Sequence, residues 1–131
     1  MYQKDKDVFN VLFEAVSEGV IVVDNQQHIV EINASAERMF GYEKKELIGQ
    51  HLNILIPQKY HAGHAAHIDG FMEHKESRQM GRGRDLYGAH KNGNSFPVEA
   101  GLNPLTINGE SFVMALVIDI TIRKQQEREL Q

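Results

Sequence analysis

The chain has 131 residues, 41% of them apolar and 24% charged, which suits one domain with one modest core. A formal net charge of -4 argues against nucleic acid as a partner, because phosphate binding needs a basic face. The absence of cysteine excludes disulfides, Cys-ligated zinc and a thiol nucleophile, and is compatible with a reducing cytoplasm. No apolar run reaches the roughly 18 residues that span a bilayer, and the charged residues 1–7 lead into no secretory segment. We therefore expect a cytoplasmic domain that makes no membrane contact.

Hydrophobic periodicity predicts a series of short helices and strands. In chain order these are a helix over residues 7–17, strands over 19–24 and 28–32, helices over 34–40, 43–47 and 57–75, strands over 79–89, 95–103 and 111–120, and a helix from 121. Asn33 can cap the helix that ends at Gly41. Asn-Gly pairs at residues 92–93 and 108–109 indicate hairpin turns. Two hairpin-linked groups around a helical middle predict an α+β fold, with helices on one face of an antiparallel sheet.

The sequence resembles the PAS domains, through motifs that occur in the order typical of that family. The matching segments are residues 18–24, 32–42 (the family's N-x-A-x-E-x-x-F-G-Y helix), 46–49, 80–83, 91–93, 96–99 and 119–121 (its D-I-T junction). The resemblance covers roughly residues 8–123 and implies a five-stranded antiparallel sheet whose helix-covered face can hold a ligand. It also implies that the chain is the input part of a histidine kinase, a cyclic-di-nucleotide enzyme or a transcription regulator.

The resemblance also divides the chain into three parts. Residues 1–18 are expected to form an N-terminal amphipathic helix that caps the domain or joins a dimer, and residues 19–120 the PAS core. Residues 121–131 are expected to begin a linker helix to a covalently attached effector.

The predicted helix after Pro57 contains the residues with the most specific resemblance. Residues 56–64 look like the haem-binding, oxygen-sensing PAS domains of the FixL type. That resemblance makes His64 the axial iron ligand and Arg84 a hydrogen-bond donor to bound oxygen or a propionate. Gly70 stands where those domains have a propionate-binding arginine, and His64 could instead be a core histidine satisfied by one hydrogen bond. The predicted pocket residues, with or without haem, are Ile32, Met39, His64, Ile68 and Arg84.

Other cofactors are less well supported. His61, His64 and His67 are three residues apart, and each step turns the direction on a helix by about 60°, so the three do not converge on one ion. His64 is therefore expected to hold metal only as haem iron. The lack of cysteine excludes a cysteinyl–flavin adduct, and the lack of tryptophan as well disfavours flavin.

Three further sets of residues are expected to carry the signal. Glu37 and Lys91 are expected to pair, as the corresponding residues often do in this family, either as a ligand-responsive latch or as an ordinary surface ion pair. An Asp or Thr at the junction Asp119-Ile120-Thr121 can bond the free N–H groups where the exit helix begins. The apolar stripe of the N-terminal helix could pack on its own sheet or on a second copy, and the resemblance favours a homodimer. That stripe comprises Phe9, Leu12, Phe13 and Val16.

No serine lies in a nucleophile motif and no phosphate-cradling glycine loop occurs, so we expect no catalysis by the domain itself. The sequence predicts a sensory input module that binds a small ligand or a partner. It would regulate an attached effector through rearrangement of a dimer. The effector expected first is a histidine kinase of a two-component phosphorelay. Two alternatives stay open: a b-type haem gas or redox sensor with His64 as axial ligand, and a ligand-free dimerisation module.

Overall fold

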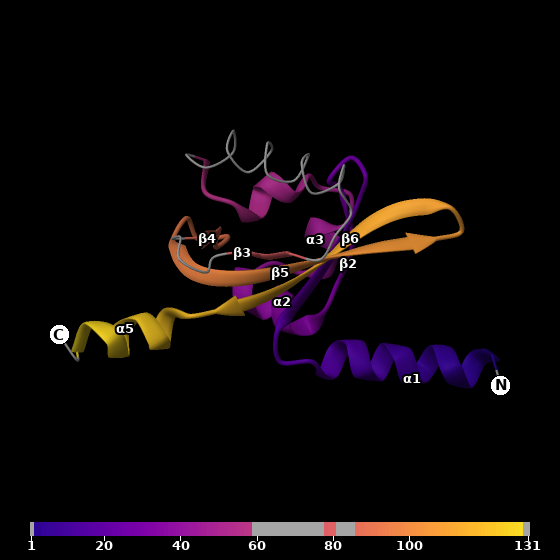
Figure 1. The fold of residues 1–131 in the computed structure, drawn as a ribbon, viewed down its shortest axis with the longest axis horizontal. Helices are drawn as coiled ribbons and strands as arrows, with labels where there is room; N and C mark the ends of the chain where they lie inside the picture. Colours follow the sequence, from indigo (N-terminus) through magenta and orange to yellow (C-terminus); the bar gives the residue numbers. More distant parts are fainter. Residues whose placement is uncertain (1, 59–77, 81–85, 130–131) are drawn as a thin grey trace.

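The computed structural model describes residues 2–58, 78–80 and 86–129 (Figure 1). Its elements are α1 (Tyr2–Ala15), β1 (Gly19–Asp24), β2 (Ile29–Ile32), α2 (Ala34–Phe40), α3 (Lys44–Leu47), the 3-10 helix η1 (Leu52–Leu55), β3 (Arg78–Met80), β4 (Tyr87–Ala89), β5 (Ser95–Ile107), β6 (Glu110–Asp119) and α5 (Thr121–Glu129). None of the described helices is long and apolar enough to cross a membrane.

The strands form one antiparallel sheet in the order β2-β1-β6-β5, and β5 has β3 and β4 along its other edge. β3 pairs with residues 100–102 of β5 and β4 with residues 95–97, so the two short strands are successive pieces of one outer strand. The sheet therefore has five positions, as predicted, and the α+β PAS fold is confirmed. Of the single strand expected over residues 79–89, the described residues show two pieces, Arg78–Met80 and Tyr87–Ala89, and residues 81–85 lie outside the description.

Two other boundaries differ from the prediction. β5 continues through Pro104 to Ile107, where a strand end was expected at Asn103. Among the described residues, β3 pairs with β5 as far as Leu102, and the edge of a sheet tolerates the missing N–H of a proline such as Pro104. The turn after β5 has positive φ at both Asn108 (51°) and Gly109 (82°), the type I′ geometry that Asn-Gly favours. η1 was not predicted, and the helix expected over residues 57–75 lies almost wholly outside the described residues.

The core lies between the sheet and the short helices. Strand residues of alternating position point inward and meet apolar residues of α2, α3 and η1. The most deeply buried side chains are Ile21, Ile29, Ile32, Leu47, Leu55 and Val113. By contrast, α1 and α5 project from this body, and their outer ends lie at opposite sides of the domain (Figure 1).

Candidate functional site

The described part of the predicted pocket is apolar. Ile32 is fully buried in the core, and Met39 packs against that core. His64, Ile68 and Arg84 lie outside the described residues, as do His61 and His67. Within residues 2–58, 78–80 and 86–129, no cluster of His, Cys, Asp or Glu could hold a metal ion. The two described members of the predicted pocket are therefore packed apolar side chains, and the predicted iron ligand is not among the described residues.

Asn33, predicted only as a helix cap, joins three segments of the chain. Its Oδ1 accepts the N–H of Ala36 (3.1 Å) as a cap, and also the N–H of Val20 in β1 (2.8 Å). Its Nδ2 donates to the carbonyl oxygens of Phe13 and Glu18, each at 3.1 Å. The side chain is fully buried, and each of its hydrogen-bonding directions is used. A buried polar group satisfied in this way holds its partners in one arrangement.

Two neighbouring side chains strengthen this connection. The Ser35 hydroxyl donates to the carbonyl oxygen of Val16 (2.6 Å), and Glu14 Oε2 accepts the N–H of Ala34 at the start of α2 (2.8 Å). We name Glu14, Asn33 and Ser35 the N-terminal clamp, because together they fix the end of α1 to α2 and β1. Sequence reasoning missed Glu14 and Ser35, since neither bond follows a local pattern.

The other end of α2 meets the turn between β4 and β5. Gly41 ends the helix with φ of 80°, and the carbonyl oxygen of Phe40 accepts the N–H of Lys91 at 2.9 Å. The Phe40 and Phe96 rings pack with centroids 5.3 Å apart. The backbone of the turn therefore contacts the end of α2 through bonds that do not involve the Lys91 side chain.

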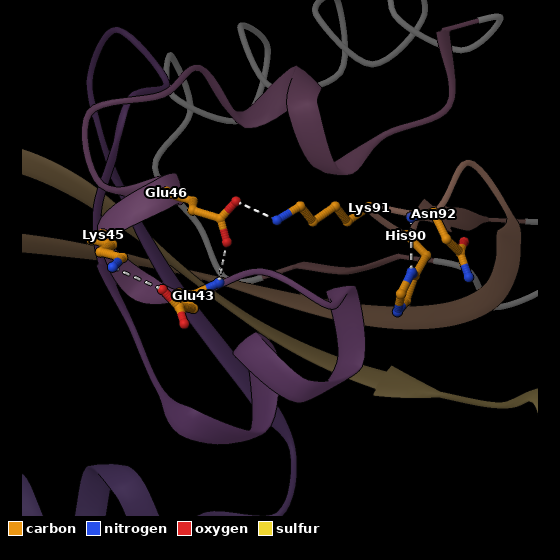
Figure 2. Close-up of polar contacts among 6 residues, drawn as sticks. All are labelled: Glu43, Lys45, Glu46, His90, Lys91 and Asn92. Atoms are coloured by element: carbon orange, nitrogen blue, oxygen red, sulfur yellow. Dashed lines mark hydrogen bonds and ion pairs between the residues drawn. The ribbon is translucent and has the colours of Figure 1, made fainter.

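Lys91 pairs with Glu46, not with Glu37, so the predicted pairing is wrong. Its Nζ lies 2.6 Å from Glu46 Oε2 (Figure 2). The bond to Phe40 places Lys91 at the end of α2, from which its side chain reaches α3, whereas Glu37 lies one turn back along the helix. The hydrogen bond from the N–H of Glu43 lowers the pKa of Glu46, and Lys91 lowers it further. The hydrogen bond to Glu46 raises the pKa of Lys91.

The exit junction, residues 119–123 with their partners on β5, joins β6 to α5. Asp119 Oδ1 accepts the N–H of Thr121 at 2.9 Å, the predicted type of bond, and also the Thr121 hydroxyl. Ile120 is buried and its N–H donates to the carbonyl oxygen of Pro97 (3.0 Å). Arg123 forms an ion pair with Glu99 of β5, a contact that the sequence did not reveal.

The predicted dimer stripe is divided between two environments. Leu12 is 62% exposed, together with Val8 (51%) and Val11 (66%). Phe13 and Val16 are half-buried, and the side chain of Phe9 lies outside the description. Among the α1 side chains that the structure describes, the large apolar ones exposed to solvent are therefore Val8, Val11 and Leu12.

Comparison with known proteins identifies the family. The PAS fold family matches residues 9–120, and the chain belongs to it. Sensor protein FixL of Bradyrhizobium diazoefficiens is 28% identical over 120 residues, which are 92% of this chain and 24% of that protein. Oxygen sensor protein DosP of Escherichia coli is 26% identical over an alignment of 132 positions, which covers 96% of this chain and 16% of that protein. The cell-division control histidine kinase PdhS of Brucella ovis is 25% identical over 119 residues, 91% of this chain and 11% of that protein.

Solved structures agree on the fold. The PAS domain of an HTR-like protein from Haloarcula marismortui matches with a TM-score of 0.79 at 21% identity, over 91% of this chain and 94% of that one. A PAS domain from Colwellia psychrerythraea matches with a TM-score of 0.78 at 22% identity, over 94% of this chain and 100% of that one.

Proposed function

We propose that this PAS domain is a cytoplasmic sensory input module that regulates an attached histidine kinase and catalyses no reaction itself. The observation that carries the proposal is the exit junction. β6 runs directly into α5, and Asp119, Ile120 and Arg123 tie the start of that helix to the sheet. A ligand or partner that shifts the sheet would turn α5, provided that it binds the two arrangements with different affinity. The names of the relatives FixL and PdhS, a sensor protein and a histidine kinase, support this assignment.

A chimera tests the proposal. The chain would replace the matching region of Brucella PdhS, and ATP-dependent autophosphorylation would be measured for the unmodified chimera and for Asp119→Ala. The substitution loosens the junction, so we expect the rate to change at least about threefold in either direction. Gln125→Ala on the exposed side of α5 is the matched control and should leave the rate unchanged. Equal rates for the chimera and Asp119→Ala would contradict the proposal.

The module is proposed to act as a homodimer through the exposed stripe of α1. Three large apolar side chains on one helix, each more than half exposed, favour burial against a second copy. Sedimentation equilibrium should give twice the chain mass of 14.9 kDa. Leu12→Glu should give the single chain mass, and Asn10→Glu on the same helix should not. A monomer mass for the unmodified protein at every concentration would contradict the proposed dimer.

A second candidate function is a b-type haem gas or redox sensor. It is favoured by the similarity to DosP, which is named an oxygen sensor, and by the apolar character of Ile32 and Met39. When bound, haem would supply an iron that can bind a gas, and His64 would hold that iron. The protein expressed with haem supplied should show a Soret band that is lost in His64→Ala and kept in His28→Ala. A colourless unmodified protein would reject haem and favour a different apolar ligand or a ligand-free dimerisation module.

A further inference from the structure

The N-terminal clamp and the exit junction are close neighbours across the sheet. Both backbone groups of Val20 bond to Asn33: its N–H donates to Asn33 Oδ1 (2.8 Å) and its carbonyl oxygen accepts the N–H of Asn33 (3.0 Å). Val20 pairs with Leu116 of β6, and the adjacent Gly19 pairs with Val117. Val117 stands two residues before Asp119. One antiparallel ladder therefore connects the residues that hold α1 with the residues that begin α5.

The residues at the centre of this connection are buried, whereas the outer clamp contact, from the N–H of Ala34 to Glu14, is exposed. Asn33 is fully buried, Val20 is 4% exposed and Val117 is 6% exposed. Breaking a hydrogen bond at such a site leaves a buried donor or acceptor without a partner, which costs roughly 1–3 kcal/mol. A movement of α1 would therefore carry Asn33 and β1 with it before any of these bonds breaks.

The exit side of the ladder is positioned to receive that movement. β6 pairs with β1 on one side through Val117 and with β5 on the other through Asp119, which lies opposite Val98. The next residue, Ile120, extends this pairing with β5, because its N–H donates to the carbonyl oxygen of Pro97. A shift of β1 relative to β5 therefore acts directly on β6, the strand that leads into α5.

We infer that the N-terminal clamp is a relay, which transmits the orientation of α1 to α5 through Asn33, Val20 and the end of β6. The domain then has two inputs, a ligand held by the core and a mechanical signal arriving through α1. Glu14, Asn33 and Ser35 are positioning residues in this device and touch no ligand. The inference uses the proposed function only to identify α5 as the output helix, and amide exchange tests it without a kinase.

The test compares amide hydrogen exchange in the unmodified chain and in the double variant Glu14→Ala/Ser35→Ala. This variant removes two bonds of the clamp and keeps Asn33, so the core remains folded. The relay predicts exchange at Ile120 that is faster by about fivefold or more, while the Ile29 amide, bonded to Gln50 on the far edge, keeps its rate. The matched control, Glu43→Ala/Lys91→Ala, removes the ion pairs Glu43–Lys45 and Lys91–Glu46 around α3 and should leave Ile120 unchanged.

A reciprocal measurement leaves the clamp intact. Coupling between two sites acts in both directions, so Asp119→Ala should raise the exchange rate of Val20 by about twofold or more. Two results would overturn the relay: faster exchange at Val20 but not at Ile120 in the clamp variant, or an unchanged Val20 amide in Asp119→Ala. Either result would reduce the clamp to a local attachment of α1, without affecting the outcome of the chimera experiment.

Discussion

The N-terminal clamp and the exit junction both join a helix to the sheet, but they use different chemistry. The clamp is centred on Asn33, an uncharged side chain that is fully buried and bonded in every direction. The exit junction relies on Asp119, which is exposed, and on the ion pair of Glu99 with Arg123, whose side chain is 50% exposed. Water competes with the second kind of contact and hardly with the first. The domain therefore attaches the end of α1 through a buried centre and the start of α5 through exposed contacts, so we expect the first attachment to be the more rigid.

The largest effect should come from Asn33→Ala. The substitution removes the cap of α2 and leaves the N–H of Val20 and the carbonyl oxygens of Phe13 and Glu18 without this partner. We expect a loss of about 3 kcal/mol in the free energy of unfolding, measured by urea denaturation. Asn33→Asp keeps the acceptor for Val20 and Ala36 but sets a carboxylate oxygen against the carbonyl oxygens of Phe13 and Glu18, so it should recover little of this loss. A loss below about 1 kcal/mol for Asn33→Ala would show that the clamp is not rigid.

Gly41→Ala should have the next largest effect. Gly41 has φ of 80°, and a Cβ there would lie 2.3 Å from Cε1 of His90. The left-handed conformation alone costs a non-glycine residue roughly 1–2 kcal/mol. The combination with His90→Ala relieves the contact but not the conformation, so the double variant should regain only part of the stability in thermal denaturation. Full recovery would mean that the contact accounts for the whole loss.

A smaller effect is expected for Asp119→Ala. The substitution removes the acceptor for the first N–H of α5 at an exposed position, so the free energy of unfolding should fall by less than about 1 kcal/mol. Local exchange of the Thr121 amide should nevertheless rise. Glu99→Gln, which weakens the bond to Arg123, should behave similarly but lose its effect in high salt. A loss of stability in Asp119→Ala as large as that in Asn33→Ala would contradict the contrast between the N-terminal clamp and the exit junction.

The smallest effect is expected for Lys91→Met. The pKa of Glu46 is lowered from 4.5 and that of Lys91 is raised from 10.5. The stability from Glu46 is therefore lost as pH falls below 4.5, and the stability from Lys91 is lost as pH rises above 10.5. The small difference in Tm between the unmodified protein and Lys91→Met should stay constant between about pH 6 and 9 and shrink toward either extreme. A difference that grows in acid would contradict the pairing with Glu46.

These contrasts also show what the sequence could reveal. The sheet, the Asn-Gly turn at Asn108, the cap at Asn33 and the Asp119–Thr121 bond follow from local patterns, and each was predicted. The bonds from Asn33 to Phe13 and Glu18, and the contact of Arg123 with Glu99, join residues between 15 and 24 positions apart. No periodicity marks such pairs. Lys91 was assigned the wrong acidic partner for the same reason, because Glu37 and Glu46 differ only in where the fold places them.

Native-state amide exchange of the unmodified protein, at Val20 and at Ile120, tests the central claim most directly. Both amides are buried and hydrogen-bonded, the first to Asn33 and the second to Pro97, so burial alone predicts similar protection. A rigid clamp and a looser exit junction predict that Ile120 exchanges about tenfold faster than Val20 after correction for intrinsic rates. Equal rates, or faster exchange at Val20, would contradict the account.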